Sequence, residues 1–155
     1  MRARPEGSAG VPKWIASLMI TYGRAALMRR ECDREIAALD SNSELEPHLA
    51  AAGLPARFRL WTFLNLWLAC LAVVAEGWDN SYKHGFPMTD PEIEGLLASE
   101  YRTHLRRFRN KIFHPEPYDH HDVRVVLNNH ASVRAWAEEL TEEFGRFFHD
   151  YLRSN

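Results

Sequence analysis

Apolar residues recur every three or four positions along most of the chain, the period of a helix with one buried face. The first such stripe begins after Lys13 and continues through Gly23, which weakens a helix without stopping it. Its members are Trp14, Leu18, Tyr22, Ala25, Met28, Cys32, Ile36 and Leu39. The polar run Asp40-Ser41-Asn42-Ser43 ends this helix, and Ser43 with Glu46 is typical of the cap of a short helix that ends at Gly53.

The next segment, Phe58–Val74, is apolar on nearly every side of a helix. A helix buried at the centre of a bundle and a membrane-spanning helix both fit this composition. We favour the buried helix, because Arg59, Thr62 and Asn65 interrupt the run and the other helices are amphipathic and need a partner. We therefore expect no membrane interaction.

A third helix is predicted after a loop over Gly77–Met88. Asp90 is its expected N-cap, and Pro91 suits the first helical position. Its apolar stripe is Ile93, Leu96, Leu97, Tyr101, Leu105, Phe108 and Ile112. The helix should end at His114, since the residue before a proline avoids helical geometry.

The last helix follows an irregular segment over Asp119–Leu127 and is expected to be capped by Asn129 or Ser132. Its stripe is Val133, Trp136, Leu140, Phe144, Phe147 and Tyr151. No segment has the period of a strand. The pattern predicts an all-α fold, a bundle of four main helices with a short extra helix and a long loop before the third main helix. The aromatic residues expected in its core are Trp61, Trp67, Phe144, Phe147 and Phe148.

Composition adds little to this picture, because the 155 residues carry a formal net charge of only −2. Residues 1–12 lack the apolar core of a signal peptide, so we predict a mobile tail followed by one cytoplasmic domain over residues 13–155. Cys32 and Cys70 lack metal-type spacing and are interpreted as reduced core thiols.

Positive charge is concentrated at the end of the third predicted helix. Five basic residues fall within little more than two turns: Arg102, Arg106, Arg107, Arg109 and Lys111. Asn110 and His114 complete a set with a fixed cation, an orienting amide and a proton carrier near neutral pH. On an ideal helix Arg109 and His114 would point about 140° apart. For both groups to act in one cleft, either the chain must leave the helix at Pro115 or two copies of the chain must pair.

The sequence Arg109-Asn110-Lys111-Ile112-Phe113-His114 resembles the signature of the HEPN superfamily, all-helical domains with an R-x(4–6)-H motif that often has a polar residue after the arginine. Glu76-Gly77-Trp78 at the end of the apolar helix and Asp90–Ile93 at the start of the next fit this resemblance, which spans roughly Leu60–Pro115. It implies a homodimer in which two facing motifs form one composite site. It also implies metal-independent endoribonuclease activity through the RNA 2′-hydroxyl, leaving a 2′,3′-cyclic phosphate, in a toxin–antitoxin or anti-phage defence module.

By position in the motif, Arg109 would stabilise the phosphate, Asn110 would orient it, and His114 would transfer protons. Arg102, Arg106, Arg107 and Lys111 are expected to hold the RNA backbone. Glu76 is expected first as an ion-pair partner of an arginine of the motif helix and second as a site residue.

One departure concerns regulation. Toxins of this family that are paired with nucleotidyltransferases usually carry a tyrosine two residues after the histidine. Here Glu116 occupies that position, and the nearest tyrosine is Tyr118. In those toxins the tyrosine is the target of a silencing modification, so its absence at this position puts this mode of control in doubt here. An antitoxin or another regulatory partner protein remains an expectation.

Other interpretations of the same residues stay open. A non-catalytic module of this fold could dock or neutralise a partner protein. Arg109 could be a surface residue paired with Glu100 or Asp119, with His114 binding the last carbonyls of the helix. A zinc site is the third alternative, but its spacing matches no closed structural site, so we expect no metal or cofactor. Its ligands would come from His114, Glu116, Asp119, His120, His121 and Asp122.

Overall fold

The computed structural model describes residues 11–41, 56–113 and 130–154, and these ranges are helical with short connections. They form α1 (Lys13–Ser41), α3 (Ala56–Asp79), the 3-10 turn η1 (Ser81–His84), α4 (Pro91–Leu97), α5 (Tyr101–Phe113) and α7 (His130–Ser154). The prediction of an all-α chain is confirmed for this part of the sequence. Residues 1–10 of the predicted tail, the short helix near Ser43–Gly53 and the segment Asp119–Leu127 lie outside the described residues.

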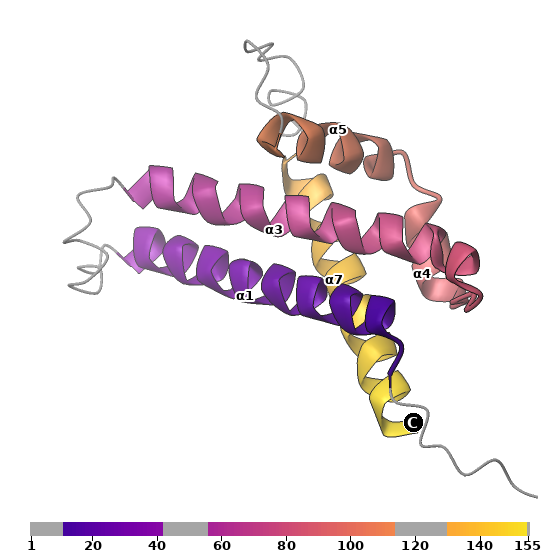
Figure 1. Ribbon diagram of the computed structural model, residues 1–155. Coiled ribbons are helices and arrows are strands. Elements are labelled where there is room, and N and C mark those ends of the chain that lie inside the picture. The colour runs from indigo at the N-terminus through magenta and orange to yellow at the C-terminus, as the bar shows by residue number, and fades with distance from the viewer. Residues whose placement is uncertain (1–10, 42–55, 114–129, 155) are drawn as a thin grey trace, which may run out of the picture.

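The helices are arranged around α3 (Figure 1). α1 runs antiparallel beside α3, α5 lies on the other side of α3, and α7 crosses behind the α1–α3 pair. α4 packs against α7. α3 is therefore in contact with most of the other elements, as expected of the most apolar segment.

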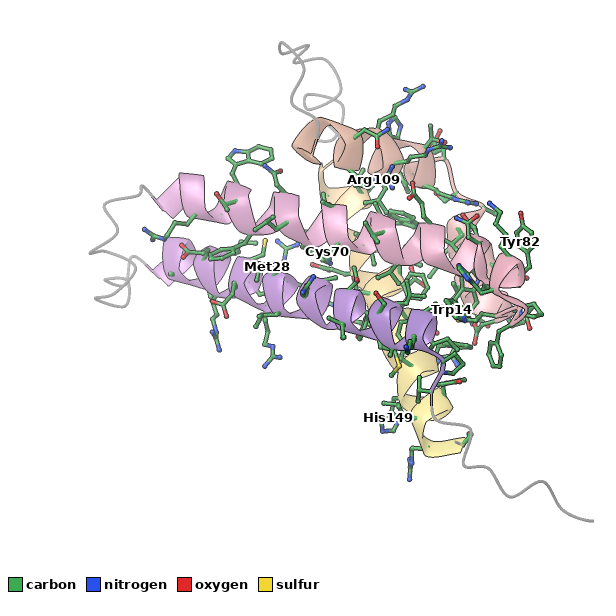
Figure 2. All side chains as sticks on the ribbon, in the orientation of Figure 1. Trp14, Met28, Cys70, Tyr82, Arg109 and His149 are labelled. Carbon is green, nitrogen blue, oxygen red and sulfur yellow. The ribbon has the colours of Figure 1, made fainter. Side chains whose placement is uncertain are left out.

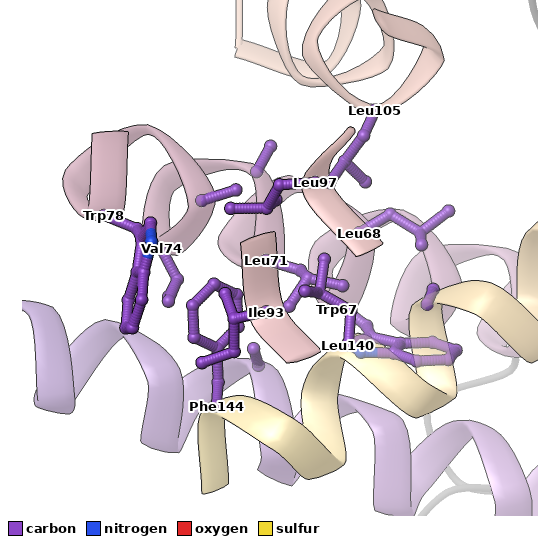
Figure 3. Close-up of a cluster of buried hydrophobic side chains, with 14 of the residues drawn as sticks. Trp67, Leu68, Leu71, Val74, Trp78, Ile93, Leu97, Leu105, Leu140 and Phe144 are labelled. Atoms are coloured by element: carbon purple, nitrogen blue, oxygen red, sulfur yellow. The ribbon is translucent and has the colours of Figure 1, made fainter. Parts of the chain in front are cut away.

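The core forms where α3, α4 and α7 meet (Figure 3). Trp67 and Leu71 on α3, Ile93 on α4, and Leu140 and Phe144 on α7 are completely buried. Each such side chain contributes about 1.5–3 kcal/mol relative to remaining exposed. The core thus holds α3 in place, and α3 in turn supports α5.

One of the predicted core aromatic residues, Trp61, differs from the expectation. Trp67, Phe144 and Phe148 are buried, and Phe147 packs on them while half-buried. Trp61 is only half-buried and lies outside the core cluster, so its assignment to the core was wrong. The reason is its position along α3, where, among the side chains that the structure describes, complete burial of apolar groups begins at Trp67.

The stretch Arg59–Asp79 of α3 is the one helix of the described residues that is long and apolar enough to cross a membrane by length and composition. Polar contacts connect it to other helices. The Arg59 guanidinium, 5% exposed, donates to both carboxylate oxygens of Glu35 on α1 at 2.9 and 3.2 Å. The indole N–H of Trp67 donates to Thr141 on α7 at 3.0 Å.

The third predicted helix is in fact two helices, which corrects the single helix expected from its stripe. The Ser99 N–H bonds to Leu96, only three residues back, at 3.2 Å. The Ser99 hydroxyl then accepts the N–H of Tyr101 at 3.3 Å, and its carbonyl accepts the N–H of Arg102 at 3.2 Å. Serine offers the backbone partners that compete with a continuous helix. α5 thereby leaves the direction of α4 and lies along α3 (Figure 1).

Two predicted boundaries also change. The expected loop over Gly77–Met88 is shorter, because α3 continues through Gly77 to Asp79 and η1 follows. Ser132 lies inside α7 and so does not cap it. Asn129, the other expected cap, lies outside the described residues. Asp90 does cap α4, since its carboxylate accepts the N–H groups of Glu92 and Ile93 at 3.1 and 3.3 Å.

Candidate functional site

A polar groove of about 800 Å³ lies between α3 and α5. Glu76 and Asp79 line it from the last turn of α3, and Arg102, Arg106 and Arg109 line it from α5. The three arginines are spaced i, i+4 and i+7, which places them on one side of an ideal helix over a rise of roughly 10 Å. Three cations facing two carboxylates leave the groove positive, although the whole chain is slightly acidic.

Arg109 is held on two sides. One of its terminal nitrogens donates to the carboxylate of Glu76 across the groove. Its Nε and its other terminal nitrogen donate to the side-chain oxygen of the adjacent Asn110 at 3.2 and 2.7 Å. The side chain is 23% exposed, so it is supported by the protein yet open to solvent. A guanidinium has five N–H donors, and the contacts with Glu76 and Asn110 use three of them.

Arg102 makes a similar contact nearer the start of α5, where it donates to the carboxylate of Asp79. This pair is more exposed, at 43% for Arg102 and 32% for Asp79. Arg106 lies between the two pairs and is exposed. The groove therefore presents one braced arginine, one exposed arginine and one arginine in an exposed ion pair.

The sequence-predicted residues divide into those that this groove gathers and those that it does not. Figure 2 labels Arg109 on α5, directly over α3. Arg107 is exposed and is not part of the lining. The side chain of Lys111, and both His114 and Tyr118, lie outside the described residues, so the separation of Arg109 from His114 stays a prediction.

Two expectations about partners can be compared with the contacts. The pairing of Glu76 with an arginine of the motif helix is observed. Arg109 is bound to Glu76 and not to Glu100, while Asp119, the other suggested partner, lies outside the described residues. Asn110 was expected to orient a phosphate, but its oxygen binds Arg109, so in this structure it orients the guanidinium.

Asp79 is the charged residue of the groove lining that the sequence analysis did not assign to the site. The sequence spacing could have indicated its role, because Asp79 follows Glu76 by three residues and so lies on the same side of α3. Ser99 and Thr103 also line the groove and carry hydroxyl groups. No group of three or more His, Cys, Asp or Glu side chains within the described ranges is placed to hold a metal ion.

Comparison with known proteins gives no relative from which to transfer a function. No protein-family model, no curated protein and no solved structure matches this chain.

Proposed function

We propose that this chain is a HEPN-type, metal-independent endoribonuclease. The observation that carries the proposal is Arg109, which Glu76 and Asn110 hold at the edge of a groove that contains two further arginines. This arginine stands five residues before His114, in the order that the family motif requires. A supported guanidinium in an open, positive groove suits a phosphodiester, which is anionic and offers several acceptor oxygens.

The proposed reaction uses the nucleophile that RNA carries. The 2′-oxygen attacks the adjacent phosphorus as a base removes its proton, and the bond to the 5′-oxygen breaks as an acid protonates that oxygen. The products are a 2′,3′-cyclic phosphate and a free 5′-hydroxyl. His114 is the proton carrier, and Arg109 stabilises the charge that builds on the phosphorane oxygens. In a homodimer with facing motifs, the second copy supplies the second imidazole.

The direct test is cleavage of transfer RNA in EDTA by the wild type and by single variants. His114→Ala should lose about 10²- to 10⁴-fold in rate, and Arg109→Ala about 10²- to 10³-fold. Arg109→Lys keeps the charge without the planar fork and should also be impaired. Arg153→Ala is the matched control, since it removes an exposed arginine of α7 that does not line the groove.

The end group of the product is part of the test. Mass spectrometry should find a cyclic phosphate on the upstream fragment. Activity that survives both Arg109→Ala and His114→Ala would overturn the assigned roles.

Two further experiments test the role in defence and the assembly. Expression of the wild type should arrest growth and expression of His114→Ala should not, as a toxin or defence effector requires. Analytical sedimentation should show that the protein is a dimer.

A second candidate is a non-catalytic module that binds a partner protein. One observation favours it: Arg102 and Arg109 are both already neutralised by carboxylates of α3, as a scaffold without a phosphate ligand would be. This candidate predicts no RNA cleavage and a stable protein complex that tolerates His114→Ala.

A further inference from the structure

A second hollow, of about 350 Å³, adjoins the arginine groove. Asp79, Leu97, Ala98 and Arg102 line both spaces, so the two meet at the Asp79–Arg102 ion pair. A ligand group held by Arg102 therefore lies at the entrance to each. This volume falls at the lower end of the range for small-ligand sites.

The second hollow differs chemically from the first. In place of further arginines it has an aromatic and apolar lining, formed by Trp78, Tyr82, Pro87 and Met88. Tyr82 is 63% exposed, and the Lys83 ammonium lies 5.7 Å from the centre of its ring. An aromatic ring presented to solvent beside a cationic groove can serve as a stacking surface.

The segment that carries Tyr82 is held by its own backbone contacts. Ser81 is buried, and its hydroxyl accepts the N–H of Met88 at 3.0 Å. Gly85 ends η1 with a φ of 71°, a left-handed conformation that glycine adopts without strain. Tyr82 (labelled in Figure 2) is thus presented by a closed turn at the end of α3.

We infer that this hollow binds the nucleobase of a nucleotide whose phosphate is held at Arg102. The inference rests on the proposed RNA-cleaving function and specifies its substrate as single-stranded RNA. A nucleotide has an anionic part and a flat part with apolar faces, and the two adjoining spaces supply arginine for one and an aromatic lining for the other. A base paired in a duplex could not reach Tyr82, because its faces are already stacked.

Glu94 on α4 gives the hollow a preference among bases. Its side chain lines the hollow, and the hollow's other carboxylate, Asp79, is paired with Arg102. A carboxylate accepts hydrogen bonds and donates none. Guanine presents two adjacent N–H donors on its Watson–Crick edge, whereas uracil presents one N–H between two carbonyl oxygens. The site is therefore expected to favour guanine and to disfavour uracil.

The test measures binding of the His114→Ala protein, which should not turn over RNA, to labelled single-stranded oligoribonucleotides. Fluorescence anisotropy would compare an all-uridine eight-mer with the same strand carrying one guanosine. Tyr82→Ala should weaken binding of the guanosine strand about 5- to 100-fold, the range for loss of one base–aromatic stack. Tyr82→Phe keeps the ring and should bind within about two-fold of the parent. Glu94→Gln should reduce the preference for guanosine.

Phe86→Ala is the matched control, because Phe86 is an exposed aromatic residue after the same turn that does not line the hollow. Equal losses from Tyr82→Ala and Phe86→Ala, or no loss from Tyr82→Ala, would overturn the inference. Absence of any RNA binding would overturn it as well. RNA binding that depends on Tyr82 without cleavage by the wild type would retain the base site and refute the nuclease. RNA cleavage that is unchanged by Tyr82→Ala would retain the nuclease and refute the base site.

Discussion

The guanidinium of Arg109 on α5 bonds to the carboxylate of Glu76, which lies near the end of α3. This contact connects the motif helix to the helix that the core holds most firmly. A side chain that is fixed before substrate arrives need not be ordered during the reaction. Glu76 is therefore a positioning residue in the proposed mechanism, since it acts through Arg109.

Replacement of Glu76 should separate catalysis from binding. Glu76→Ala should lower kcat about 10- to 100-fold, because Arg109 loses its support, while KM stays the same or falls as one negative charge leaves the groove. Glu76→Gln keeps an acceptor for Arg109 and should lose less. Initial rates over a range of RNA concentrations measure the split. Glu139→Gln, a change at an exposed carboxylate of α7, is the control. An unchanged kcat for Glu76→Ala would remove Glu76 from the mechanism.

Replacement of Asp79 should act on RNA affinity. Its carboxylate occupies Arg102 and competes with a phosphate for that cation. Asp79→Asn should strengthen RNA binding about 1.5- to 5-fold, the range expected for an exposed ion pair. Freeing one arginine should also steepen the dependence of log affinity on log salt by about 0.7 for single-stranded RNA. Anisotropy titrations at several salt concentrations measure both quantities, and Arg102→Ala should show a shallower slope. Identical slopes for the three proteins would contradict a phosphate contact at Arg102.

The periodicity of apolar residues was sufficient to predict the long helices, because which residues share one side of a helix is a local property of the sequence. The pairing of Glu76 with an arginine of the motif helix was expected from its charge and its position at the end of the buried helix. The break at Ser99 escaped prediction because the apolar stripe continues across it in phase. The hydroxyl and the carbonyl of Ser99 accept the backbone N–H groups of the residues that follow, in place of the bonds of a continuous helix. The pattern of apolar residues carries no information about this competition.

Burial along α3 could be predicted only in part. Val73 belongs to the same apolar run as Trp67 and Leu71, yet it is 36% exposed while they are completely buried. The composition of α3 indicates that most of its surface must be buried, but which of its faces are buried depends on where α1, α5 and α7 lie. For the same reason the groove could not be derived from α5 alone, since Ala72, Ala75, Glu76 and Asp79 of α3 also line it.

Two helical glycines should respond oppositely to alanine. Gly23 is exposed and a Cβ added there meets nothing within 4 Å, so Gly23→Ala should stabilise the protein by about 0.5–1 kcal/mol. A Cβ on Gly77 would lie 2.4 Å from the side chain of the buried Leu18. Overpacking of this kind costs about 1–3 kcal/mol, which offsets the gain in helix propensity. Urea unfolding should therefore rank Gly23→Ala above the wild type and Gly77→Ala at or below it. Equal stabilisation by both would show that α1 and α3 do not pack this closely at Gly77.

The two cysteines should react slowly as thiols in the folded protein. Both are free, and burial raises the pKa of Cys32 to about 11 despite the opposing charge of Arg134. Burial also raises the pKa of Cys70, against the effect of Arg24. At pH 8 about one Cys32 in a thousand is therefore a thiolate, the form that reacts. Labelling with a disulfide reagent should proceed at Cys32 far more slowly in buffer than in denaturant. Rapid labelling of Cys32 without denaturant would contradict its burial.

The cap of α4 should make part of the stability depend on pH. Burial raises the pKa of Asp90, but the hydrogen bond from Arg146 at 2.8 Å and the N–H groups of Ile93 and Glu92 outweigh it, so the pKa lies below its usual value. A carboxylate whose pKa is lowered on folding stabilises the folded state above its unfolded pKa, and loses that effect as pH falls through the folded pKa. Asp90→Asn keeps a capping oxygen but loses the charge, so it should cost about 0.5–1 kcal/mol at pH 7. Asp90→Ala also loses the cap and should cost about 1 kcal/mol more.

Unfolding free energies measured from pH 7 down to pH 3 test this dependence. The stability of the wild type should approach that of Asp90→Asn as the pH falls, while the difference between Asp90→Asn and Asp90→Ala persists. A constant difference between the wild type and Asp90→Asn across that range would mean that the charge of Asp90, and so its pair with Arg146, contributes nothing to stability.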